Sequence, residues 1–170
     1  AYRLAKSLLS RFTAKKESAD EESSMRILRN LETEVDRHPT SDNYAKLASI
    51  YSMISEPQKQ REALFKSLKL NPDNYAALGQ LGLYYRRQGE YLKAAESFEK
   101  ALRLIPNGTE PKIEAFANLA ECYKLAGDYR ASERIYRQSI EYMPDHPGAY
   151  GCLGDLYLDM NRYDEAEKLF

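Results

Sequence analysis

The sequence predicts an all-α protein, an α-α superhelix or solenoid of repeated helix pairs, and two observations lead to this fold class. First, the chain aligns with itself at intervals close to 34 residues, so that one pattern recurs four times. Second, each copy carries a leucine, a small residue and a tyrosine at fixed spacing. These columns are Leu47, Leu81, Leu119 and Leu153, then Ala48, Gly82, Ala120 and Gly154, then Tyr51, Tyr85, Tyr123 and Tyr157. Such periodicity is typical of stacked helical units that bury their apolar faces only against neighbouring units.

The clearest copy predicts where its two helices lie. Residues 75–87 place Leu81 and its apolar neighbours at helical spacing on one face, and residues 91–104 do the same around Phe98. Gly89 falls between the two helices, where a positive φ is needed and glycine adopts it without strain. The equivalent residues of the other copies are Ser55, Gly127 and Asn161. Antiparallel helix pairs are therefore predicted at 41–72, 75–106 and 113–144, with a partial pair from 147.

Small residues within the helices predict close helix contacts. Gly82 costs about 1 kcal/mol of helix propensity relative to alanine, so we expect a neighbouring helix to approach it, with Ala94 as its partner. The copy from 41 is less regular, because Pro57 opens its second helix and Gln60 replaces the small residue there. Proline suits the first turn of a helix, so this pair should remain intact with looser packing.

These patterns divide the chain into units. Residues 1–40 are expected to form an N-terminal helical pair, either a degenerate repeat or a cap. The repeats are placed at 41–74, 75–108 and 113–146, with an inter-repeat insertion at 109–112 and a truncated repeat at 147–170. Because Phe170 is a core-type residue with no following unit, we expect a fragment of a longer array whose C-terminal end self-associates or whose last helix frays.

Composition restricts the function. The net charge is −1 with 30% charged residues, which argues against nucleic-acid binding, and no apolar run is long enough for a membrane span. Cys122 and Cys152 form no metal-binding spacing, and no catalytic motif or cofactor-binding loop is present. We therefore expect no enzyme activity and no cofactor. Cys122 should be a packing residue and Cys152 a more open thiol, which favours a reducing, cytoplasmic compartment while the localisation stays open.

The columns of leucine, small residue and tyrosine, ending at Pro72, Pro106 and Pro144, resemble the tetratricopeptide repeat. This resemblance implies a right-handed superhelix whose first helices line a concave groove that binds a peptide or helix of another protein. The residues expected to line it are Ala45, Lys46, Ser49, Gly79, Gln80, Leu83, Arg86, Ala117, Asn118, Glu121, Lys124, Gly151, Cys152 and Asp155. One column of this surface is small throughout: Ala45, Gly79, Ala117 and Gly151.

Some members of this family bind the acidic C-terminal tail of chaperones through lysine and asparagine side chains. One register would require cations at Gly148 and Cys152, and the other would place Ala45 and Glu114 among the binding residues. The chaperone-tail function is therefore rejected. The alternatives kept are a self-assembly module of a larger protein and, less favoured, a nucleic-acid-binding helical repeat.

Overall fold

The computed structural model describes residues 25–106 and 113–169, and within these ranges every regular element is a helix. Residues 25–37 are helical. The following helices are α2 (Ser41–Met53), α3 (Pro57–Leu70), α4 (Tyr75–Arg87), α5 (Tyr91–Arg103), α6 (Ile113–Leu125), α7 (Tyr129–Tyr142), α8 (Pro147–Asp159) and α9 (Tyr163–Glu167). The predicted all-α fold class is confirmed. The expectations for residues 1–24 and 109–112 lie outside the described residues, and the unit boundaries stay a prediction.

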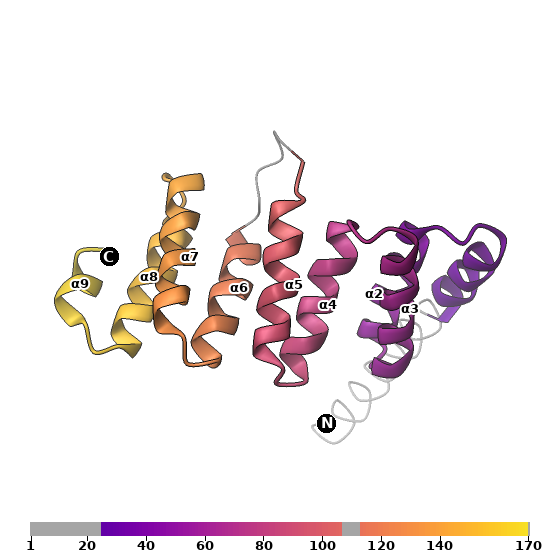
Figure 1. Cartoon of the computed structure of the whole chain (residues 1–170), viewed down its shortest axis with the longest axis horizontal. Helices are drawn as coiled ribbons and strands as arrows, with labels where there is room; N and C mark the ends of the chain where they lie inside the picture. Colours follow the sequence, from indigo (N-terminus) through magenta and orange to yellow (C-terminus); the bar gives the residue numbers. More distant parts are fainter. Residues whose placement is uncertain (1–24, 107–112, 170) are drawn as a thin grey trace, which may run out of the picture.

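The helix pairs follow one another in a row along the long axis of the molecule (Figure 1). Each first helix packs against the second helix of its own pair, and each second helix against the first helix of the next pair. The first helices α2, α4, α6 and α8 also contact one another in succession. The array therefore has one face built from consecutive first helices, which is the arrangement that a continuous groove requires.

The turns inside the four pairs have the predicted backbone conformation. Gly89 and Gly127 have φ values of 75° and 85°, and Ser55 and Asn161 have φ values of 59° and 58°. The prediction of a left-handed residue at all four positions is confirmed. Ser55 adopts this conformation without the freedom of glycine, so its turn is the least favourable of the four.

The core contains the predicted columns, and at Gly82 a large aromatic ring lies against the helix. Leu119 and Leu153 are fully buried, as are Ala48 and Ala120. A Cβ atom added to Gly82 would lie 2.7–2.8 Å from ring carbons of Phe98. The large ring of Phe98 therefore packs directly against Gly82, a neighbour that the sequence pattern did not indicate, and the expected contact with Ala94 stays a prediction.

The irregular pair formed by α2 and α3 is held by polar contacts as well as by apolar packing. Pro57 is the first residue of α3, as predicted. Gln60 is only 2% exposed, and its Oε1 accepts a hydrogen bond from Arg87 Nη2 at 2.7 Å. The same arginine donates through Nη1 to Ser52 Oγ at 3.0 Å. Arg87 of α4 thus bridges both helices of the preceding pair and satisfies a buried amide that would otherwise be costly.

Candidate partner-binding groove

The predicted groove residues all lie on first helices, and hydrogen bonds join these helices along the row. Between α2 and α4, Gln80 Nε2 donates to the carbonyl oxygen of Ala45 at 3.1 Å. Between α4 and α6, Arg86 Nη1 donates to Asn118 Oδ1 at 2.6 Å. Between α6 and α8, Lys124 Nζ donates to Asp159 Oδ2 at 3.0 Å. Each junction between first helices therefore carries a polar contact in which at least one predicted groove residue takes part.

The column of small residues leaves open space at two of its four positions. A Cβ atom added to Gly79 or to Gly151 would meet no atom within 4 Å. Ala117 is half-buried, and Ala45 is only 4% exposed. The surface therefore has room above α4 and α8, whereas the Ala45 side chain is buried and presents almost no area to a partner.

Charged side chains among the predicted groove residues are concentrated between α6 and α8. Lys124 Nζ lies 2.9 Å from Glu121 Oε2 and 3.0 Å from Asp159 Oδ2. Burial alone would lower the pKa of Lys124, but hydrogen bonds to these two carboxylates raise it above its usual value. Asp155 is exposed and adds a further negative charge on α8. The lysine is thus fully charged and held between carboxylates, with the negative charge in excess at this end.

Burial raises the pKa of both thiols. Cys122 is completely buried, and burial raises its pKa to about 11. Cys152 is half-buried; burial, then Asp155 and Glu121, raise its pKa as well. Cys122 is a buried packing residue, as predicted, and Cys152 is the more open of the two, although it is half-buried against the core and not fully solvent-facing. Neither thiol has the lowered pKa of a reactive cysteine.

Two amide groups of the groove have unused hydrogen-bonding capacity within the described residues. Gln80 Oε1 is buried without a hydrogen-bond partner there. Asn118 Oδ1 is engaged by Arg86, whereas its Nδ2 donates no hydrogen bond within the same part of the chain. An unpaired buried acceptor costs free energy unless a ligand or water satisfies it.

A second set of polar contacts joins consecutive pairs and was not foreseen from the sequence. Three tyrosines of the aligned column donate to a glutamate of the preceding unit. They are Tyr51 to Glu32 Oε1 at 2.8 Å, Tyr123 to Glu99 Oε1 at 2.6 Å and Tyr157 to Glu133 Oε1 at 2.9 Å. Burial and these carboxylates raise the pKa of Tyr51 and of Tyr123 to about 12. The sequence signal that could have indicated two of these hydrogen bonds is a constant spacing, since Glu99 and Glu133 each lie 24 residues before their tyrosine.

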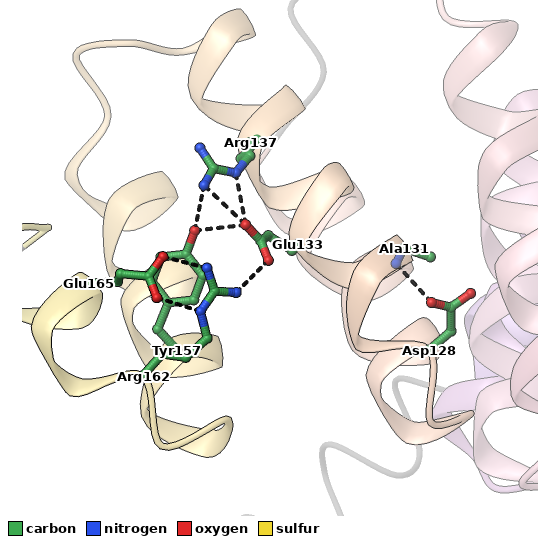
Figure 2. A network of polar contacts seen from close by, with 7 residues as sticks. All are labelled: Asp128, Ala131, Glu133, Arg137, Tyr157, Arg162 and Glu165. Carbon is green, nitrogen blue, oxygen red and sulfur yellow. Dashed lines mark hydrogen bonds and ion pairs between the residues drawn. The ribbon is translucent and has the colours of Figure 1, made fainter.

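Glu133 is the centre of the most extensive of these networks (Figure 2). Its carboxylate accepts from Arg162 Nη1 at 2.7 Å, from Arg137 Nε at 3.0 Å and from the Tyr157 hydroxyl. Arg162 also pairs with Glu165 of α9. Burial raises the pKa of Glu133, but the hydrogen bonds from the two arginines and the tyrosine outweigh it and lower the pKa overall. The network ties α7 to α8 and to the short α9.

The described residues offer no metal site, because no three His, Cys, Asp or Glu side chains come together among them. No helix in this part of the chain is both long and apolar enough to cross a membrane. His146, one of two histidines in the chain, accepts a hydrogen bond from the backbone N–H of Gly148 at 3.1 Å and so caps α8. Its observed role is structural.

Comparison with known proteins gives a consistent family. Two family models described as tetratricopeptide repeat match residues 73–145 and 124–170, which together span more than half of the chain. General transcriptional corepressor trfA of Dictyostelium discoideum is 29% identical over 120 residues, covering 69% of this chain. The chain spans only 8% of that relative's length.

Two solved structures share the fold. The crystal structure of MamA has a TM-score of 0.75 at 22% identity and covers 91% of this chain and 88% of that one. The crystal structure of YrrB, described as a TPR protein with an unusual peptide-binding site, has a TM-score of 0.69 at 19% identity, with coverages of 82% and 70%. At these identities the likeness concerns the fold alone. Taken with the aligned columns and the stacked helix pairs, the two family matches show that this chain belongs to the tetratricopeptide repeat family.

Proposed function

We propose that the chain is a non-catalytic interaction module and that the face formed by α2, α4, α6 and α8 binds a peptide or helical segment of a partner protein. A tetratricopeptide repeat array is consistent with a protein-interaction scaffold. The particular surface and the kind of ligand are the proposal.

The observation that carries the proposal is the free space at Gly79 and Gly151. Side chains are absent at these positions, and none from elsewhere fills the gap within 4 Å of where a Cβ would be. Glycine inside a helix costs about 1 kcal/mol relative to alanine, so two such residues on one surface are unfavourable for folding alone. Space for the backbone of a bound ligand would explain why glycine occupies both positions.

The amides beside this space provide the polar contacts that a peptide needs. Gln80 Oε1 lacks a hydrogen-bond donor within the described residues; because this oxygen is itself buried, the half-buried side chain would have to rotate outward to accept from a backbone N–H of a bound segment. Asn118 Nδ2 would donate to a backbone carbonyl oxygen. Binding through the main chain is compatible with the peptide-binding description of YrrB, although that description applies to YrrB itself.

The test uses the segment that co-purifies with the full-length protein, mapped by limited proteolysis and synthesised. Gly79→Arg combined with Ala117→Arg should reduce its affinity at least a hundredfold, because two long side chains would occupy the groove. The control is Leu92→Arg with Glu96→Arg on the exposed face of α5, which should bind normally. Both variants should retain full helicity by circular dichroism. Unchanged affinity of the groove variant would refute the assignment.

The salt dependence of binding distinguishes the nucleic-acid alternative from the proposed protein interaction. Binding dominated by phosphate contacts weakens steeply as the salt concentration rises, and no such dependence is expected for a short single-stranded DNA probe here.

A second candidate function is self-association through α8 and α9. It is favoured by the exposure of two large apolar side chains at this end, Leu158 at 42% and Tyr163 at 61%. Light scattering should then show a dimer or higher species that becomes monomeric in Leu158→Lys/Tyr163→Lys. A wild-type monomer at high concentration would remove this candidate.

A further inference from the structure

A cleft of about 820 Å³ lies between the second helices α5 and α7 and shares no lining residue with the groove. Its floor is apolar and includes Leu102, Phe116, Leu119 and Ile135. Tyr142 closes one side, with its ring 5.5 Å from that of Phe116 and more than half of its side chain exposed. The volume is within the range of sites that bind small ligands or short peptide segments. An exposed aromatic beside an apolar floor is the usual composition of an interaction hot spot.

Four arginines and three glutamates surround this floor, but most of the carboxylates are already used. Glu133 accepts hydrogen bonds from Arg137, Arg162 and Tyr157. Glu99 accepts from the Tyr123 hydroxyl. Only Glu141 among the three makes no ion pair or side-chain hydrogen bond to another described residue.

The arginines around the cleft have fewer ion-pair and hydrogen-bond partners than the glutamates within the described residues. Arg130 and Arg134 line the cleft from α7, are exposed, and form no salt bridge within the described parts of the chain. Arg103 is 71% exposed and lies 4.0 Å from Glu99, a carboxylate that Tyr123 already engages. The charge left over at the rim is therefore positive. Guanidinium groups bind carboxylates through two parallel hydrogen bonds and also pack against apolar surface.

We infer that this cleft is a second docking site and that it binds an acidic segment of a partner protein, with an apolar side chain on the floor and carboxylates against Arg130 and Arg134. The charge of the rim selects an anionic ligand, and the apolar floor with Tyr142 selects one that also buries a hydrophobic side chain. A basic segment would meet unpaired arginines, and a purely ionic ligand would leave the floor uncovered. Because the cleft and the groove lie on different residues, the protein could hold two segments at once.

The experiment selects a random peptide library displayed on phage against the immobilised chain carrying Gly79→Arg/Ala117→Arg, so that the groove is blocked. Enriched peptides are synthesised, and their affinity is measured by fluorescence anisotropy. The expected peptides combine Asp or Glu with a large apolar residue. Reversal of charge in Arg130→Glu/Arg134→Glu should weaken them at least tenfold, because two attractive contacts become repulsive. Arg61→Glu/Lys69→Glu, which makes the same change of net charge on exposed residues of α3, should have no effect.

Tyr142→Ala separates this site from a general anion-binding surface. It should weaken the selected peptides several-fold while leaving helicity intact. If no enriched peptide depends on Arg130 and Arg134, or if the dependent peptides lack apolar residues and tolerate Tyr142→Ala, the inference is overturned. Single-stranded DNA binding that needs the arginines while acidic peptides do not bind would overturn it equally. None of these outcomes affects the groove, which is blocked throughout.

Discussion

Two glycines on one helix allow the steric argument for helix packing to be tested with a matched pair of substitutions. Gly79 and Gly82 both lie in α4, and each would gain about 1 kcal/mol of helix propensity on change to alanine. They differ in surroundings. A Cβ at Gly79 meets nothing within 4 Å, whereas a Cβ at Gly82 would lie 2.7–2.8 Å from the buried ring of Phe98.

Gly79→Ala should therefore stabilise the protein by about 1 kcal/mol. Gly82→Ala carries the same gain but forces the Phe98 ring to move in a packed core, which costs roughly 1–3 kcal/mol. The two variants should thus differ by about 1–3 kcal/mol in their free energy of unfolding, with Gly82→Ala the less stable.

The assay is urea unfolding followed by circular dichroism, with the midpoints compared at equal slopes. A double-mutant cycle with Phe98→Leu should show coupling at Gly82 and none at Gly79, because only the former contacts the ring. Equal stabilisation by both alanines would refute the assignment of Gly82 as a close packing contact.

Three further predictions concern the turns, the Glu133 network and the thiols. Ser55→Gly should raise the free energy of unfolding by roughly 0.5 kcal/mol. Glycine removes the steric cost of the left-handed conformation, and part of this gain is offset because glycine increases the conformational entropy of the unfolded chain. Gly89→Ala should lower the free energy of unfolding by about 1 kcal/mol, and both are read from urea midpoints. The folded-state pKa of Glu133 is below its ordinary value of 4.5, so its contribution is complete above that pH and is lost as the pH falls below it. Glu133→Gln should accordingly unfold at lower urea than the wild type at neutral pH, with the difference shrinking in acid; a constant difference would contradict this. A thiol reagent should modify Cys152 alone in the native protein and Cys122 only after unfolding, and rapid modification of both would contradict the burial of Cys122.

The sequence was sufficient for those features that each unit repeats. Residues that need a special backbone conformation recur at one position, which is why Ser55 and Asn161 could be recognised beside the two glycines. The columns of Leu119 and Ala120 define a buried face because their spacing is helical. The same periodicity places the first helices, and the resemblance to the tetratricopeptide repeat implies that the groove residues lie on them.

What could not be predicted depends on contacts between side chains of different units. The Phe98 ring that packs against Gly82 was not predicted, because periodicity shows which positions are small but not which large side chain lies against them. The sequence did not single out Glu133, since its contacts arise only when Arg162 and Tyr157 from the next unit converge on it. The cleft between α5 and α7 likewise depends on the separation of two second helices, which no local pattern specifies.

The most direct test of the proposed groove is site-specific photo-crosslinking in the full-length protein bound to its partner. Benzoylphenylalanine is placed singly at Ser49 or Asp155, exposed positions on first helices, and at Gln58 or Glu96, exposed positions on second helices. The groove assignment predicts that one continuous partner segment crosslinks at Ser49 and Asp155, and that this segment is absent from the crosslinks at Gln58 and Glu96. Crosslinking of that segment at the second-helix positions, with none at Ser49 and Asp155, would contradict it.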